Sequence, residues 1–193
     1  MKLELKIVDL LARNAERKYT INGIARALKG HYSLVHRTVK KMLEEGVIAK
    51  ENAGKAHLCS LNFANEKSLM LIQLSEIERK NELFNSNKEL KLILEDFVKS
   101  AETQLHAISI VLFGSYAKGE ATKKSDIDIL LVRQKKAGVD KVMKEMYAKY
   151  GKEINVIAVT PKEFVAQKSE FKEMLHTRFV LFGVQKFVSL VLK

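Results

Sequence analysis

Apolar residues recur at helical spacing through the first 46 residues of the chain, and polar interruptions divide them into three stretches. The first stretch predicts a helix over residues 3–15, in which Arg13 to Arg17 form a polar exit. Thr20 and Ser33 stand at the start of the second and third stretches as candidate N-caps, and a glycine follows each of these stretches as a stop signal. The pattern therefore predicts three short helices in succession.

The period then changes from helical to strand-like. Residues 47–51 and 56–61 are typical of two strands, and residues 52–55 between them include turn-forming Asn and Gly. This predicts a β-hairpin directly after the third helix. Three helices followed by a hairpin is the order of elements in winged helix-turn-helix domains, and residues 1–62 resemble that family over their whole length.

In winged-helix proteins the second helix of the turn motif enters the major groove of DNA, and the hairpin touches the backbone or the minor groove. The resemblance implies that the polar side of the third helix faces double-stranded DNA, whereas a plain solvated helix face is the alternative interpretation. Arg37 is the candidate for base contact because its guanidinium matches guanine, and the lysines are candidates for phosphate contact. The DNA-binding candidates are Ser33, His36, Arg37, Lys40, Lys41 and Lys55, and Lys50 and His57 are further hairpin candidates.

Residues 66–104 contain neither proline nor glycine, and their apolar residues recur at roughly helical intervals. Polar residues gather over 81–88, so we predict two helices that are joined there. Three interpretations of these helices stay open. They form a connector that packs on both domains, a dimerisation surface that produces a homodimer, or ordinary packing within one chain.

From residue 107 onward, strand-like and helix-like stretches alternate. Thr160, Pro161 and Glu163 form a capping box that starts one of the helices. Strands are predicted at 108–113, 126–132 and 154–159, and helices after Gly114, at 139–150, after Thr160 and at 186–193, while 180–182 is too short to assign. The predicted fold class is α/β in the broad sense (α+β): a winged helix domain (1–62), a helical connector (63–105) and a domain with a mixed sheet and flanking helices (106–193).

The segment that carries chemistry joins the first two of these strands. Gly114 and Ser115 end a buried strand, and Asp126 and Asp128 open the next strand after ten intervening residues. Gly114 allows a phosphate to approach the backbone, and Ser115 adds a hydroxyl donor. Residues two apart on a strand face the same side, so both carboxylates are placed to share a magnesium ion that a nucleotide's phosphates also hold.

This segment resembles the minimal nucleotidyltransferases of the DNA polymerase beta superfamily, whose signature is Gly-Ser, ten residues and Asp-x-Asp. The resemblance implies transfer of a nucleoside monophosphate from a nucleoside triphosphate to a hydroxyl or similar acceptor, with pyrophosphate leaving. It also implies that Gly114 and Ser115 hold the β- and γ-phosphates. Asp126 and Asp128 are, by the same resemblance, the catalytic residues that bind the Mg²⁺ cofactor.

The third strand departs from the pattern of this family. Active members bring a third carboxylate from that strand, and the matching position here is Asn155. An amide oxygen ligates magnesium but does not accept a proton at neutral pH, and the loss of a general base costs ~10²–10⁴ in rate. Glu153, two residues earlier on the same strand face, is the alternative third ligand.

The net charge of +11, from 34 Lys and Arg against 23 Asp and Glu, fits two anionic partners, DNA and a triphosphate. Residues 1–65 hold +6 of it. The single cysteine, Cys59, excludes a disulfide framework and a multi-cysteine zinc site, and we expect it to be an inert core residue. No apolar run approaches the ~20 residues that cross a bilayer, so we expect a cytoplasmic protein without a membrane partner.

Two functions are consistent with these features. The first is a DNA-binding, transcription-regulator-like protein whose nucleotidyltransferase-like domain binds Mg-nucleotide and transfers a nucleoside monophosphate to a partner. The alternative is an active nucleotidyltransferase, for example an adenylyltransferase that resembles the antitoxin half of a toxin pair. In that case the winged helix domain docks a protein or nucleic-acid acceptor.

Overall fold

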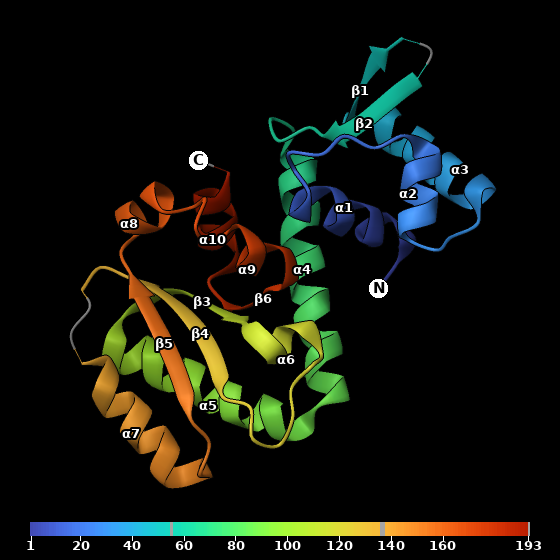
Figure 1. Ribbon diagram of the computed structural model, residues 1–193. Coiled ribbons are helices and arrows are strands. Elements are labelled where there is room, and N and C mark those ends of the chain that lie inside the picture. The colour runs from blue at the N-terminus through green and yellow to red at the C-terminus, as the bar shows by residue number, and fades with distance from the viewer. Residues whose placement is uncertain (55, 136–137, 193) are drawn as a thin grey trace. The chain divides into compact units, whose positions relative to one another are not determined.

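The computed structural model describes residues 1–54, 56–135 and 138–192, and the chain divides into two units, Met1–Glu78 and Arg79–Lys193 (Figure 1). The division falls inside a long helix, α4 (Glu66–Ser86). The three-part division at 62/63 and 105/106 stays a prediction. We describe each unit by itself.

The first unit has the predicted order of three helices followed by an antiparallel hairpin. Thr20 caps the second helix, since its Oγ1 accepts a hydrogen bond from the backbone N–H of Gly23 at 3.0 Å. The prediction for Ser33 was wrong, because the third helix begins two residues earlier, at Tyr32, with His31 as its N-cap. The elements are α1 (Leu3–Arg13), α2 (Ile21–Ala27), α3 (Tyr32–Glu44), β1 (Ile48–Ala53) and β2 (Ala56–Leu61).

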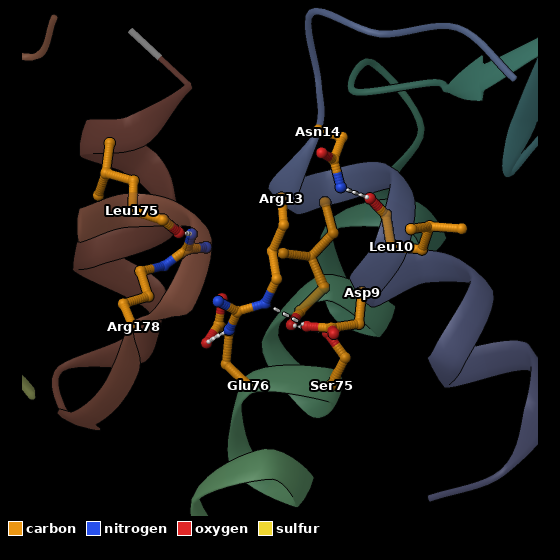
Figure 2. A network of polar contacts seen from close by, with 9 residues as sticks. Asp9, Leu10, Arg13, Asn14, Ser75, Glu76, Leu175 and Arg178 are labelled. Carbon is orange, nitrogen blue, oxygen red and sulfur yellow. Dashed lines mark hydrogen bonds and ion pairs between the residues drawn. The ribbon is translucent and has the colours of Figure 1, made fainter. Parts of the chain in front are cut away.

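A buried ion network joins α1 to α4 in this unit. Arg13, which the sequence pattern placed in a polar exit, has a side chain only 5% exposed. Its Nε donates to Asp9 Oδ1 at 2.6 Å, and its Nη2 donates to Glu76 Oε2 at 3.1 Å (Figure 2). The prediction failed because the partner that permits burial, Glu76, is 63 residues away in the sequence. Cys59 is fully buried as expected, and burial raises the pKa of its thiol.

The break between the two connector helices lies where the sequence predicted it. The helix α4 ends at Ser86, and α5 (Lys88–Leu105) begins after Asn87. The side chain of Asn87 caps α5 by accepting a hydrogen bond from the N–H of Leu90 at 2.9 Å. A cap in the middle of a continuous apolar pattern is therefore what separates the two helices.

The second unit contains a four-stranded mixed sheet in the order β5-β4-β3-β6. The strand β3 pairs antiparallel with both β4 and β6, and β4 pairs parallel with β5. This confirms the predicted mixed sheet with flanking helices, and the short stretch that was left unassigned forms β6. The elements are β3 (Ala107–Phe113), α6 (Gly114–Lys118), β4 (Ile127–Arg133), α7 (Val139–Tyr150), β5 (Ile154–Val159), α8 (Pro161–Ala166), α9 (Lys172–Thr177), β6 (Phe179–Phe182) and α10 (Val184–Val191).

Helices cover both faces of this sheet (Figure 1). Ile127 and Ile129 of β4 are buried in a cluster with residues of α5 and α7. Leu130 and Val132, which point the other way, are buried with residues of α8 and α10. The capping box before α8 is present as predicted, because Thr160 and Glu163 bond each other's backbone N–H groups. Among the described residues, the structure has no helix long and apolar enough to cross a membrane.

Candidate active site

The sheet topology brings the predicted site residues to one edge. Because β3 runs antiparallel to β4, the end of β3 lies beside the start of β4, and β5 starts at the same edge. The register pairs Asp128 with Phe113 on one side and with Asn155 on the other. Gly114 follows Phe113 directly, so that the Gly-Ser and Asp-x-Asp segments meet.

Gly114 is held in a conformation and a space that exclude other residues. Its φ is +71°, and a Cβ built there would lie 2.0 Å from Oδ2 of Asp128. The carboxylate of Asp128 therefore packs directly against the Cα of Gly114. Sequence reasoning gave this glycine a role in admitting a phosphate, and the structure adds that the same glycine makes room for the neighbouring carboxylate.

The side-chain amide of Asn155 lies between the two aspartates. Its Nδ2 is 3.5 Å from Asp126 Oδ2 and 3.4 Å from Asp128 Oδ1, within donating distance of both. These are long, weak hydrogen bonds, and the three side chains reach solvent. The nitrogen and oxygen of an amide exchange places by a half-turn, so Asn155 also has an oxygen to offer to a cation at this position.

The two carboxylates meet an amide but no basic side chain. Among the residues the structure describes, neither Asp126 nor Asp128 forms an ion pair, and no group of three or more His, Cys, Asp or Glu side chains gathers in a metal-binding arrangement. Two carboxylates and an amide oxygen fit Mg²⁺, which prefers oxygen ligands and takes the rest from waters and substrate phosphates. The donor set therefore suits a metal that arrives with a nucleotide.

Glu153, the alternative third ligand, lies just before β5. Its backbone carbonyl accepts a hydrogen bond from the N–H of Ile127 at 2.9 Å, which pairs the starts of β4 and β5. Its side chain is exposed, and the hydrogen bonds to the aspartates come from Asn155 instead. The geometry thus favours Asn155 as the third member of the cluster.

The loop between α6 and β4 is held by contacts that sequence reasoning missed. Ser125 Oγ accepts a hydrogen bond from the N–H of Thr122 at 2.9 Å. Lys152 Nζ donates to the carbonyl of Lys123 at 2.7 Å and lies 5.7 Å from the centre of the Tyr116 ring. Sequence reasoning missed the contact of Lys152 because its partner is a backbone carbonyl, which gives no residue-specific signal in the sequence. Ser115 is half-buried at the start of α6, beside Gly114.

The predicted DNA-binding residues lie on α3 of the first unit and on its hairpin. The apolar side of α3 buries Val35, Val39 and Met42, so the opposite side faces solvent. The α3 candidates are all exposed on that side: Ser33, His36, Arg37, Lys40 and Lys41. In the hairpin Lys50 and His57 are exposed, and Lys55 lies outside the described residues.

Comparison with known proteins identifies the second unit. Residues 88–186 match the family profile described as nucleotidyltransferase domain. The chain is 34% identical over 86 residues to "Putative protein adenylyltransferase MJ1305" of Methanocaldococcus jannaschii, which covers 39% of this chain and 58% of that protein. It is 49% identical over 43 residues to "Putative protein adenylyltransferase MJ1379" of the same organism, covering 22% of this chain and 43% of that protein. The matched segments thus span roughly half of each relative's length, and no solved structure matches.

Proposed function

The chain belongs to the nucleotidyltransferase domain family, and from this premise we propose that its second unit transfers a nucleoside monophosphate from a Mg-bound triphosphate to a hydroxyl of a protein. Adenosine is the proposed nucleoside and protein the proposed acceptor because the matched relatives carry the name protein adenylyltransferase. The observation that carries the proposal is the meeting of Gly114, Asp126 and Asp128 at one sheet edge, where the Asn155 amide lies within reach of both carboxylates.

The roles follow from the position of each side chain. Asp126, Asp128 and the amide oxygen of Asn155 would hold Mg²⁺ together with the triphosphate, and Gly114 and Ser115 would lie beside the β- and γ-phosphates. Mg²⁺ held there would supply positive charge to the phosphate oxygens as the reaction proceeds. The acceptor oxygen forms a bond to the α-phosphorus while the bond to the β-phosphate oxygen breaks, and pyrophosphate leaves. Asn155 does not take the acceptor's proton, which passes to the solvent that reaches this exposed edge.

Slow turnover is part of the proposal. A positioned general base contributes about 10²–10⁴ in rate, and an amide in its place forgoes that factor. Binding of Mg-nucleotide needs only the oxygen ligands and is retained. We therefore expect nucleotide binding together with a low kcat.

The test is transfer of radiolabel from α-labelled ATP, with Mg²⁺, to the products of neighbouring genes and to proteins of a cell extract. We expect a labelled protein band with the natural chain, and at least about 10³-fold less label with Asp126→Asn or Asp128→Asn, since each removes a metal ligand. Asp140→Asn, which removes an exposed aspartate on α7, is the matched control and should label normally. Equal labelling by the Asp128→Asn variant would refute the assignment of the site.

A second candidate function concerns the first unit. We propose that it is a winged helix domain that binds duplex DNA, because α3 presents Arg37, Lys40 and Lys41 to solvent while its apolar side is buried. Arg37→Ala should reduce affinity for duplex DNA in fluorescence anisotropy by about 10-fold, and affinity should fall steeply with salt. Lys6→Ala, on the exposed side of α1, is the control. Absence of binding to duplex DNA at low salt would leave docking of an acceptor as the role of this unit.

A further inference from the structure

A cavity lies in the second unit, at the same edge of the sheet as the carboxylates but on the opposite face. Its volume is about 770 Å³, within the range of ~300–1,000 Å³ that is typical of small-molecule sites. Side chains alternate along a strand, and Asp128 lies between Ile127 and Ile129, which are buried against α5 and α7. The cavity is lined by the end of α4, the start of α5, α6 with the loop after it, and the end of α7 with the loop after it. Its lining includes none of Gly114, Ser115, Asp126, Asp128 and Asn155, so it is distinct from the site of the two aspartates.

The lining of the cavity combines an apolar floor with a basic rim. Leu90 and Ile93 of α5 form the buried floor, and two tyrosine rings stand beside it. The hydroxyl of Tyr150 donates a hydrogen bond to Asp96 Oδ2 at 3.0 Å, which holds the ring in place at the wall of the cavity. The polar and charged lining residues are Ser86, Asn87, Glu89, Thr122, Lys123 and Lys152.

The two lysines retain capacity to bind an anion. Lys152 donates one of its three N–H groups to the carbonyl of Lys123, and two N–H groups remain. Lys123 is exposed, and no hydrogen bond or ion pair within the described residues uses its Nζ. Glu89 offsets one of the two charges, so that the rim keeps a net positive charge. Because Lys152 Nζ binds the backbone carbonyl of Lys123, the ammonium of Lys152 lies beside the backbone of Lys123, and both residues line the cavity.

We propose that this cavity binds a small phosphorylated ring compound, of the class of a nucleoside monophosphate, at a site distinct from the transfer site. The phosphate lies between Lys123 and Lys152, where charge-assisted hydrogen bonds form, and the ring packs on Tyr116 and the apolar floor. Both features are needed, since a solvated lysine pair alone gives weak anion binding and the floor alone selects no charged group. This site does not depend on Mg²⁺ or on catalytic activity.

The test is isothermal titration of the full chain with AMP in the presence of EDTA, which removes Mg²⁺ from the carboxylates. We expect saturable binding of AMP, and at least about 10-fold weaker binding of both adenosine and inorganic phosphate. Lys123→Met and Lys152→Met should each weaken AMP binding by about 10-fold, the size of one charge-assisted contact. Lys124→Met is the matched control, because Lys124 is exposed on the same loop but does not line the cavity.

Two comparisons separate this site from its alternatives. Lys123→Met leaves in place the carbonyl that Lys152 binds, so its effect reports lost charge and not a displaced loop. Asp128→Asn should bind AMP in EDTA as the natural chain does. The proposal is overturned if millimolar AMP does not bind, if adenosine binds as well as AMP, or if binding is lost in Asp128→Asn and kept in both lysine variants. The readout involves no transfer, so failure of the proposed enzyme activity leaves the result unaffected.

Discussion

Each unit of the chain brings two carboxylates together, and the two pairs meet very different neighbours. In the first unit Asp9 and Glu76 share the guanidinium of Arg13, and the side chains of Arg13 and Glu76 are 5% and 2% exposed. In the second unit Asp126 and Asp128 share only the amide of Asn155, at 3.4 and 3.5 Å, at a solvent-exposed edge. Arg13 offsets part of the negative charge of the first pair, whereas no cation among the described residues forms an ion pair with the second.

This difference separates a structural role from a chemical one. A buried carboxylate without a partner is costly, so the first unit supplies a permanent cation and gains a link between two helices. The half-buried pair at the sheet edge forms no ion pair among the described residues, so its carboxylate oxygens are available to a cation that comes from outside. We therefore interpret the first cluster as a stabilising contact and the second as the proposed binding site for metal and nucleotide.

The largest expected effect comes from displacing the pair at the sheet edge. In Gly114→Ala the new Cβ would meet Asp128 Oδ2 at 2.0 Å, so the carboxylate must move away from the metal position. Displacement of a catalytic group by about 1 Å costs on the order of 10²-fold, and loss of the ligand costs more. We expect transfer of label to fall by about 10³-fold, together with loss of Mg-dependent ATP binding in calorimetry.

Gly119→Ala is the matched control for this variant. Gly119 has a φ of +76°, close to the +71° of Gly114, but a Cβ there would meet nothing within 4 Å. Both alanines carry the strain of a positive φ, about 1–3 kcal/mol, and only one collides with a carboxylate. Equal loss of ATP binding in the two variants would show that backbone strain, and not the position of Asp128, governs the site.

The buried pair should respond to loss of its cation through stability. Arg13→Met removes the guanidinium that contacts both Asp9 and Glu76, and a broken buried ion pair costs about 3–5 kcal/mol. Urea unfolding followed by circular dichroism measures this cost. Lys18→Met removes the lysine of an exposed pair with Glu51, at 2.6 Å, and should cost less than about 1 kcal/mol. Similar losses in both variants would contradict the distinction between a buried and an exposed network.

A third carboxylate beside Asp126 and Asp128 should raise turnover. Asn155→Asp places a charge next to Asp126 and Asp128, at the position where the amide now lies. The added charge tightens Mg²⁺ binding and supplies a proton acceptor, so we expect turnover to rise by about 10- to 100-fold. Glu153→Gln should leave turnover unchanged, since the side chain of Glu153 is not the one bonded to the aspartates. A large loss in Glu153→Gln would instead identify Glu153 as the third ligand.

Local patterns were enough to predict several features of the fold. The hairpin, the break over 81–88 and the capping box at Thr160 each depend on residues close in the sequence, and all three are present. The proximity of Gly114 to the aspartates could also be predicted from the sequence, because one short segment of two strands and their connection holds all of these residues. These parts of the molecule follow from short-range rules of capping, turns and alternation.

Features that depend on residues far apart in the chain could not be predicted from the sequence. Arg13 looked like a solvent-exposed helix end, and only the fold brings Glu76 to it. Lys152 carries no motif, and its partner is the backbone carbonyl of Lys123, which every residue possesses. The steric reason for Gly114 likewise requires the position of the Asp128 carboxylate in space. Contacts between side chains and distant backbone leave no signature in a single sequence.

The smallest expected effect concerns a third kind of carboxylate, Asp96, which pairs with a cation at the surface. Lys149 Nζ lies 2.6 Å from Asp96 Oδ2, and the Tyr150 hydroxyl donates to the same oxygen at 3.0 Å. The hydrogen bond from Lys149 is the main cause that lowers the pKa of Asp96, and the same bond raises the pKa of Lys149.

A carboxylate with a lowered pKa contributes stability that is present above its ordinary pKa, about 4, and is lost as the pH falls through its folded value. Asp96→Asn should therefore destabilise the chain by less than about 1 kcal/mol near pH 7, and by nothing measurable at about pH 2. Urea unfolding at the two pH values measures this, with Glu102→Gln, an exposed residue of α5, as the control. If Asp96→Asn lowers the free energy of unfolding equally at both pH values, Asp96 acts by packing. Charge pairing would then distinguish only the cluster of Asp9 and Glu76 from that of Asp126 and Asp128.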